Sequence, residues 1–264
     1  MRTICFLSDF GLADDFVGTC KGVMLKISPG AQIIDLTHQV PNFAVEAGAE
    51  ILQHATRYMP DDSVYLAVVD PGVGTERREI ALETPSGAMM VGPDNGLLIP
   101  AAEALGGVSS AVELTNDRYK IHPVSNTFHG RDVFSPAATH LASGVEISEL
   151  GEAIPLDSLE HMTVAEDEAR DGDIIARVID VDRFGNARLS VREDVSGLRY
   201  GGELKLDIGD GDMGIRYVAT FGAAGAGELI LVPDSHWRLS VSINKGSAAH
   251  ALSLSVGAKV RIKR

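Results

Sequence analysis

The sequence has few aromatic residues, two cysteines and no long hydrophobic run. Aromatic side chains make up 5% of the 264 residues, so the core must be mostly aliphatic. Cys5 and Cys20 are too few for a disulfide framework, and they fit a reducing compartment. No stretch approaches the ~20 apolar residues of a membrane helix, and the first apolar stretch is too short for a signal peptide. We therefore expect a cytoplasmic protein that does not act at a membrane.

Positive charge is also scarce. Against 37 acidic residues there are 23 Lys and Arg, a formal net charge of −14. Because affinity for duplex nucleic acid comes largely from neutralising phosphates, this balance excludes a nonspecific nucleic-acid binder. The acidity is concentrated in residues 1–170, since residues 171–264 carry a net charge of +1. This asymmetry favours two structural units.

Several familiar motifs are missing. No G-x-G-x-x-G follows the first predicted strand, and there is no P-loop sequence, so a dinucleotide or nucleoside-triphosphate loop is not indicated. A G-x-S-x-G nucleophile elbow is absent as well. The eight histidines show no HExxH-like spacing and there is no CxxC, so we expect no metal.

The first part of the chain alternates strands with helices. Residues 3–7, 31–36 and 64–69 are short apolar runs typical of buried strands, and residues 16–26 and 45–58 have helical spacing. This alternation predicts an α/β fold with a mostly parallel central sheet. A further helix is expected over residues 134–142, beginning next to Asp132.

The pattern changes after a strongly acidic stretch at residues 146–173, which we interpret as a solvated connector. Seven short strand-like runs follow, separated by Gly, Asp and Asn, and they predict a small antiparallel β-barrel or sandwich. We therefore expect an N-terminal α/β domain over residues 1–165 and a C-terminal β domain over residues 172–264.

Two carboxylates follow apolar strands directly, Asp9 after residues 3–7 and Asp70 after residues 64–69. Ligands of open parallel sheets bind beyond the carboxyl ends of the strands. Each aspartate alone is equally compatible with a simple turn. Together they favour a polar ligand such as a sugar diol, because one carboxylate can accept hydrogen bonds from both of its hydroxyls.

Two further segments carry candidates for proton chemistry. Arg77 lies seven residues after Asp70 and would orient that carboxylate if it folded back, although an ordinary surface arginine is the simpler alternative. His129 could carry a proton near neutral pH, although a lone histidine usually has no such role. Phe128 suits either the core or stacking on a base.

In the second part of the chain, Asn186 ends a turn that begins at Asp180, and Trp237, the one tryptophan, lies in a turn at residues 234–237. Asparagine can donate and accept hydrogen bonds, which suits a ribose or an amino-acid zwitterion. Taken alone, the turn at Asn186 is an ordinary hairpin turn.

These motifs together resemble one family, the S-adenosyl-L-methionine (SAM) hydroxide adenosyltransferases, or SAM hydrolases, which are relatives of the fluorinases and chlorinases. The resemblance runs in order through nearly the whole chain. The matching segments are SDFG (8–11), DDFVGTCKGVM (14–24), VVDPGVGTERR (68–78), VGPDNGLL (91–98), NTFHGRD (126–132), DRFGN (182–186) and the final strands.

The resemblance implies an N-terminal α/β domain, a C-terminal β-barrel and a homotrimer whose ligand sites lie between neighbouring subunits. It implies conversion of SAM and water to adenosine and L-methionine, with SAM as the substrate and no cofactor. Asp70, Arg77 and His129 match the family's catalytic set, and Asp9 matches its ribose-binding aspartate. The other implied substrate-binding positions are Phe43, Phe128, Phe184, Asn186, Ser235, Trp237, Ile243 and Lys245.

Within that set, Ser235 matches a serine that holds the methionine end, and Ile243 and Lys245 fall where backbone groups meet adenine. His236 and Trp237 replace a more usual small turn, and Ser240 stands where many relatives have an acidic residue.

Three other activities compete with hydrolysis. A halogenase is disfavoured by Asp70, since a carboxylate beside the nucleophile would repel a halide. A non-catalytic SAM or adenosine sensor would have no need of a water-activating set. A methyltransferase would leave S-adenosylhomocysteine instead of adenosine.

Overall fold

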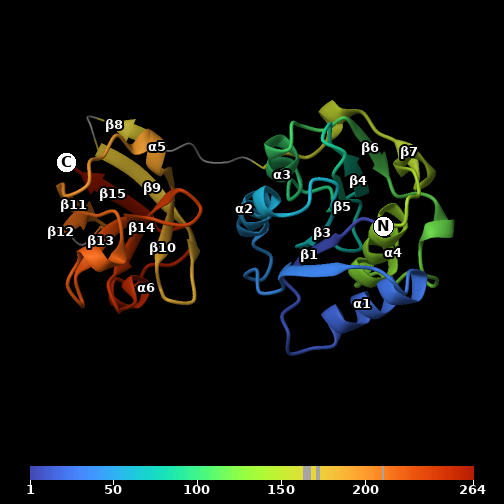
Figure 1. Ribbon diagram of the computed structural model, residues 1–264, viewed down its shortest axis with the longest axis horizontal. Helices are drawn as coiled ribbons and strands as arrows, with labels where there is room; N and C mark the ends of the chain where they lie inside the picture. Colours follow the sequence, from blue (N-terminus) through green and yellow to red (C-terminus); the bar gives the residue numbers. More distant parts are fainter. Residues whose placement is uncertain (163–167, 171–172, 210) are drawn as a thin grey trace. The chain divides into compact units, whose positions relative to one another are not determined.

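The computed structural model describes residues 1–162, 168–170, 173–209 and 211–264. The chain divides into two compact units (Figure 1), which confirms the two domains expected from the sequence. The predicted bounds at residues 165 and 172 fall outside the described residues and stay a prediction.

The first unit is built on one sheet with the strand order β2-β1-β3-β5-β4-β6-β7. The four strands β2, β1, β3 and β5 are mutually parallel, whereas β4 pairs antiparallel with both β5 and β6. Five of the seven strands thus point the same way, which confirms the mostly parallel sheet. The strands are β1 (Ile4–Ser8), β2 (Ile33–Thr37), β3 (Val64–Val68), β4 (Glu79–Glu83), β5 (Met89–Pro93), β6 (Ser110–Glu113) and β7 (Glu152–Ala153).

Helices cover both faces of this sheet (Figure 1). Helices α1 (Phe16–Ile27) and α4 (Ser135–Ala142) pack on one face, and α2 (Val45–Ala55) and α3 (Ile99–Ala104) on the other. Side chains alternate between the faces along each strand, so Phe6 joins the first core and Leu7 the second. All five residues of β3 are buried, as expected of a strand covered on both sides.

Residues 146–162 of the acidic stretch 146–173 are part of this unit, so the interpretation as a connector was wrong for them, while residues 163–167 and 171–172 lie outside the described residues. Ile147 and Leu150 are buried in the core shared by α1 and α4, while Glu149 between them is exposed. Strand β7 then pairs with β6 at the edge of the sheet. Two short 3₁₀ turns, η4 (Ile147–Glu149) and η5 (Leu156–Ser158), flank β7.

The helix expected at residues 134–142 is α4, and it is preceded by a π-helical turn, η3 (Gly130–Phe134). Asp132 lies inside this turn and does not cap the helix. π-turns recur at functional sites, because they redirect side chains relative to a regular helix. Here the turn follows directly on His129. Two 3₁₀ turns elsewhere in this unit are η1 (Thr56–Tyr58) and η2 (Asp117–Tyr119).

The second unit is a closed barrel. Of the two folds predicted from the sequence, a β-barrel and a β-sandwich, the barrel is therefore the correct one. Seven strands close through the neighbours β9-β10-β14-β13-β12-β11-β15 and back to β9, and β8 extends the sheet beside β9. Among the described residues of this unit, pairing is antiparallel except between β12 and β13. The strands are β8 (Glu168–Arg170), β9 (Asp173–Val181), β10 (Ala187–Arg192), β11 (Glu203–Asp207), β12 (Asp212–Tyr217), β13 (Leu229–Pro233), β14 (Arg238–Ile243) and β15 (Lys259–Lys263).

Aliphatic side chains fill the barrel core, with Tyr217 as its largest fully buried member. The connections hold three short helical turns, α5 (Glu193–Ser196), η6 (Phe221–Ala223) and α6 (Ala248–Ala251). Within the described parts of the chain, no helix is long and apolar enough to cross a membrane.

Candidate active site

Asp9 and Asp70 emerge at the same edge of the first sheet. Strands β1 and β3 pair in parallel with Ser8 opposite Val68, so the residues that follow each strand leave the sheet side by side. This is the carboxyl end of the parallel strands, where open sheets bind their ligands. The structure therefore places both carboxylates where the sequence predicts a polar site.

A tight turn after β3 brings Arg77 back onto Asp70. The Thr75 amide and hydroxyl both donate to the Gly72 carbonyl, at 3.1 and 2.7 Å. The Arg77 Nε donates to the two Asp70 oxygens at 2.9 and 3.1 Å, and its Nη2 donates to Oδ2 as well. Both side chains are at most 10% exposed. The alternative of an ordinary surface arginine is therefore wrong.

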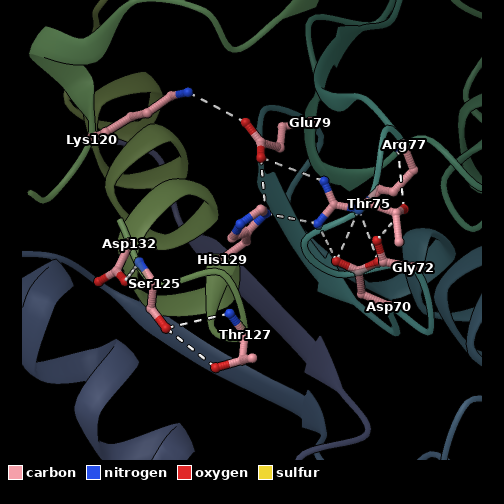
Figure 2. Close-up of polar contacts among 10 residues, drawn as sticks. All are labelled: Asp70, Gly72, Thr75, Arg77, Glu79, Lys120, Ser125, Thr127, His129 and Asp132. Atoms are coloured by element: carbon pink, nitrogen blue, oxygen red, sulfur yellow. Dashed lines mark hydrogen bonds and ion pairs between the residues drawn. The ribbon is translucent and has the colours of Figure 1, made fainter. Parts of the chain in front are cut away.

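His129 joins this pair from a third segment of the chain (Figure 2). Its Nδ1 lies 3.1 Å from Arg77 Nη2, and the imidazole is 10% exposed. The Arg77 guanidinium also lies over the Phe134 ring, 5.2 Å from its centroid, which adds a cation–π contact. The Arg77 guanidinium thus joins Asp70, seven residues away in sequence, to His129, 52 residues away.

Gly74 locks the two segments of the site together. A Cβ on Gly74 would lie 2.3 Å from the Asn126 carbonyl oxygen, and the residue has a φ of +75°. Only glycine combines that backbone conformation with such close approach. The glycine of the turn after β3 therefore sets how closely the loop carrying His129 can approach it.

Two charged residues that the sequence analysis did not single out complete the network. The Glu79 Oε1 lies 2.9 Å from His129 Nδ1, and the Lys120 Nζ lies 3.4 Å from Glu79 Oε2. Glu79 Oε1 also lies 3.7 Å from Arg77 Nη1. All are partly shielded, with Glu79 19% and Lys120 15% exposed. A carboxylate at the start of strand β4, whose three central residues are apolar, was the available signal.

Opposing effects act on the pKa of His129. Burial lowers it, the Glu79 and Asp70 carboxylates raise it, and the charges of Arg77 and Lys120 lower it. The net effect places the pKa of His129 below its ordinary value. Near neutral pH the imidazole is therefore mainly neutral, which is the form that can take up a proton.

The loop that carries His129 is fixed by a buried carboxylate. Asp132 accepts hydrogen bonds from the Ser125 amide at 2.9 Å and from Arg131 at 2.7 and 2.8 Å. Burial raises the pKa of Asp132, but the hydrogen bonds from Arg131 and Ser125 outweigh it, so this pKa lies below its ordinary value. The Asp132 carboxylate is therefore structural.

Phe128 packs between the core and the surface. Its ring meets Phe16 and Phe10 edge to face, with centroids 5.1 and 5.6 Å apart, and Arg131 lies over it at 5.1 Å. Both alternatives for this residue, core packing and stacking on a base, are compatible with its half-buried position.

Asp9 and Phe43 also come together. The Phe43 amide donates to Asp9 Oδ2 at 3.0 Å, so the aspartate holds the chain before α2. Phe43 has a φ of +65°, unusual for a large side chain, and its ring is 68% exposed. An exposed aromatic ring held beside a carboxylate suits contact with a ribose, the role predicted for both.

Four barrel candidates share one end of the barrel. Phe184 and Asn186 lie in the β9–β10 turn, and Ile243 and Lys245 lie where β14 ends. Because Ala187 pairs with Val241, these two segments are neighbours. The Asn186 side chain donates to the Asp182 carboxylate at 2.7 Å, which fixes its amide.

Ser235 and Trp237 lie at the other end of β14, in the β13–β14 turn. At ~3.3 Å per residue, six residues separate Trp237 from Ile243 by about 20 Å along the strand. The Trp237 carbonyl accepts from the Glu193 amide, and the residue has a φ of +61°. The barrel candidates therefore form two groups that cannot contact one small chemical group together.

A metal site is not assembled by the described residues, among which no three His, Cys, Asp or Glu side chains are grouped to hold an ion. The polar centre of the first unit is instead the ion-paired network around Arg77.

An α/β unit with a polar network at the carboxyl edge of its sheet, followed by a closed barrel, defines a class of two-domain proteins. Residues 4–151 match the model of the SAM hydroxide adenosyltransferase N-terminal domain, and residues 176–261 match that of the C-terminal domain. The chain belongs to the SAM hydroxide adenosyltransferase family, which confirms the resemblance seen in the sequence.

The relatives are similar over almost their full lengths. A protein of Salinispora tropica named (R)-S-adenosyl-L-methionine hydrolase is 42% identical, over 98% of this chain and 97% of that protein. A fluorinase of an Actinoplanes species is 28% identical, over 99% and 97%. The crystal structure of an uncharacterised conserved protein from Thermotoga maritima covers 99% of this chain and 100% of its own, with a TM-score of 0.93 and 34% identity.

Proposed function

We propose that this protein hydrolyses SAM to adenosine and L-methionine. The observation that carries the proposal is the buried contact of Asp70, Arg77 and His129 at the carboxyl edge of the sheet. Membership of the family, and relatives named SAM hydrolase, support the same reaction. The relatives are named for the (R) epimer at sulfur, so we propose that epimer as the substrate.

The reaction is an in-line displacement at C5′ of the ribose. The water oxygen forms a bond to C5′ while the C5′–S bond breaks. The electron pair of the C5′–S bond goes to sulfur. The sulfonium becomes the neutral thioether of methionine, and the proton of the water passes to a base, either Asp70 or His129. Positioning of the water and C5′ can contribute on the order of 7–11 kcal/mol in ideal cases.

The remaining candidate residues would hold the two ends of the substrate. Asp9 would accept from the ribose hydroxyls, with Phe43 and Phe128 as neighbouring aromatic surfaces. The two groups of barrel residues suit an elongated ligand, since SAM has adenine at one end and the methionine zwitterion at the other. The adenosine group is Phe184, Asn186, Ile243 and Lys245, and the methionine group is Ser235 and Trp237.

Hydrolysis is favoured over halogenation by the local charge. Asp70 and Glu79 place two carboxylates beside Arg77, so no unpaired positive charge is left to hold a halide. A carboxylate next to a partly desolvated halide costs several kcal/mol. Incubation with SAM and chloride should therefore yield adenosine and no 5′-chlorinated nucleoside.

We also propose a homotrimer with ligand sites shared between subunits, free of any cofactor and located in the cytoplasm. The barrel side chains predicted to bind adenosine and methionine include Phe184 and Trp237, which are 71% and 56% exposed. Large exposed apolar side chains mark interaction surfaces. Light scattering coupled to gel filtration should give three times the 28.0 kDa of one chain.

The first experiment is incubation with each epimer of SAM in ¹⁸O-water, with mass spectrometry of the products. Adenosine labelled at its 5′ oxygen, together with unlabelled methionine, is the expected result for attack by water at C5′. SAM bound without turnover would replace the proposal with the sensor, and S-adenosylhomocysteine would replace it with a methyltransferase.

Subunit mixing tests whether sites are shared. A trimer made only of Asp70→Asn chains should lose most of its turnover. A trimer made only of Asn186→Ala chains should bind SAM more weakly. If a site joins the α/β unit of one subunit to the barrel of the next, refolded equal mixtures regain about a quarter of the intact sites. No regain would place each site within one chain.

A further inference from the structure

The Nδ1 atom of His129 lies between two groups of opposite character. Arg77 Nη2 is 3.1 Å away and can only donate, whereas Glu79 Oε1 is 2.9 Å away and, as a carboxylate, can only accept. One ring nitrogen cannot accept a hydrogen bond and donate one at the same time. Arg77 and Glu79 therefore favour different protonation states of the imidazole (Figure 2).

Each partner selects one tautomer. With its hydrogen on Nε2, neutral His129 accepts from Arg77 at Nδ1, and Nε2 can only donate. With its hydrogen on Nδ1, the ring donates to Glu79, and Nε2 carries the free lone pair. Only this second tautomer can take a proton from a water at Nε2, because the partner of one ring nitrogen fixes the role of the other.

Glu79 is held in place to act as that partner. It is the first residue of β4, where its backbone faces Pro93 of β5 and its carbonyl accepts from the Leu114 amide at 2.8 Å. Its second oxygen pairs with Lys120. The Oε1 position is therefore fixed by the sheet on one side and by a cation on the other.

Asp70 is less suited to take the proton. Both of its oxygens already accept from Arg77 Nε, and Oδ2 accepts from Nη2 as well. Protonation of Asp70 would weaken these charge-assisted bonds, which are about twice as strong as neutral ones. Protonation of His129 at Nε2 would instead strengthen the bond from its Nδ1–H to the Glu79 carboxylate.

We propose that Glu79 is a positioning residue that makes His129 the base of the reaction, by accepting the hydrogen on Nδ1 so that Nε2 takes the proton of the attacking water. The inference rests on the proposed hydrolysis of SAM. As the O–C5′ bond forms and the C5′–S pair goes to sulfur, His129 becomes an imidazolium, and Glu79 balances its charge. Arg77 then keeps Asp70 oriented beside the water.

The charged groups that act on His129 come from several segments. They are Asp70 after β3, Arg77 and Glu79 at the start of β4, Lys120 after η2, and Asp132 in η3.

Nitrogen-15 NMR of the histidine rings tests the tautomer without any turnover. The proteins are the wild type, Glu79→Gln and the control Glu83→Gln, with His129→Asn to assign the signals. Glu83 is the last residue of β4 and accepts a hydrogen bond from the Ser110 hydroxyl. The control therefore removes a hydrogen-bonded carboxylate from the other end of the same strand. We expect the Nδ1–H tautomer in the wild type and in the control, and a shift toward Nε2–H in Glu79→Gln.

The same spectra give the titration of His129. Loss of the Glu79 charge should lower the pKa of His129 further, since that carboxylate raises it. An unchanged tautomer and an unchanged titration midpoint in Glu79→Gln would overturn the proposal, as would an Nε2–H tautomer in the wild type. These outcomes are independent of whether SAM is hydrolysed, so they are distinguishable from a failure of the proposed function.

Kinetics separate positioning from a merely structural role. In Glu79→Gln, kcat on the plateau should fall roughly 10²-fold, in the range of general-base effects, with KM for SAM within about twofold. The acidic limb of the kcat profile should move to lower pH. A fall in kcat without movement of that limb, together with a lower melting temperature than Glu83→Gln, would show a structural role and overturn the proposal.

Discussion

The two units of the chain present their candidate residues in different ways. In the α/β unit, Asp70, Arg77 and His129 bond to one another and are nearly buried, and Asp9 bonds to the backbone of Phe43. In the barrel, the candidates lie on turns at both ends of β14, and several are largely exposed.

We propose that this difference separates the residues that take part in the reaction from those that recognise the ligand. A network that its own chain holds in place is preorganised, and preorganised charges are the main source of catalytic stabilisation. Largely exposed side chains on turns, such as Phe184 and Trp237, are available to contact a ligand. We therefore expect changes in the α/β network to act on kcat, and changes in the barrel turns to act on ligand affinity.

The largest effect is expected at Asp70. Asp70→Asn keeps the size of the side chain and removes the charge that orients Arg77, so turnover of SAM should fall by ~10²–10⁴-fold. Adenosine binding, measured by calorimetry, should stay within a fewfold of the wild type. Asp62→Asn, at the opposite end of β3, is the control and should keep full activity. Unaltered turnover in Asp70→Asn would remove this residue from the mechanism.

The second-largest effect is expected at Asp9. This residue belongs to the α/β unit, but it is predicted to bind the ribose and not to take part in the reaction. Asp9→Asn can still accept from the Phe43 amide, so the local chain should hold. Loss of a charged hydrogen-bond acceptor should weaken adenosine binding about 10- to 150-fold. Binding of 2′,3′-dideoxyadenosine should change little, since it lacks the hydroxyls.

Calorimetry with both nucleosides measures this difference, and Asp14→Asn on the following exposed loop is the matched control. Equal losses for adenosine and its dideoxy analogue would show that Asp9 shapes the loop and does not contact the ribose.

The α/β network was partly predictable from sequence because its aspartates directly follow apolar strands. The return of Arg77 onto Asp70 was predicted as one of two alternatives, and the turn through Gly74 explains why it occurs. Glu79 was missed, since a charge at the head of a strand normally faces solvent. Glu79 is partly buried and pairs with Lys120, which is 41 residues away in sequence, so no local pattern could indicate this contact.

In the barrel, the strands could be predicted from the sequence but the positions of the candidate residues could not. The short strands were predictable from alternating apolar residues between Gly, Asp and Asn. The positions of the predicted ligand-binding residues were not predictable, because they depend on the register in which the strands pair. The pairing of Ala187 with Val241 brings Asn186 to the end of β14 where Ile243 lies, and leaves Trp237 at the far end of that strand. Register is set by pairing across the whole barrel, which the sequence of one turn does not contain.

A third test concerns what holds the α/β network rigid. Asp132 is fully buried, and its loss should destabilise the loop that carries His129. Asp132→Asn should lower the free energy of unfolding of the first unit by ~1–3 kcal/mol at pH 7. Asp157→Asn, an exposed carboxylate of the same unit, should change it little.

The pH dependence of that loss follows from the lowered pKa of Asp132 in the folded chain. Its stabilising contribution is fully present above the unfolded value of ~3.9 and is lost as the pH falls through the lower folded value. Urea unfolding at pH 7, 5 and 3 should show the difference between wild type and Asp132→Asn shrinking only at the lowest pH. A difference that grows on acidification would contradict this assignment.

The smallest effects are expected in the barrel, where Asn186 and Ser235 are assigned to opposite ends of the ligand. Asn186→Ala should weaken adenosine and SAM by a similar factor, about 2- to 10-fold for one neutral hydrogen bond. Ser235→Ala should weaken SAM by a comparable factor and leave adenosine unchanged, because adenosine lacks the methionine end. Calorimetry with both ligands on both variants gives the four affinities. If Ser235→Ala weakened adenosine as much as SAM, the separation along β14 would not divide adenine from methionine, and the barrel would act as one recognition surface.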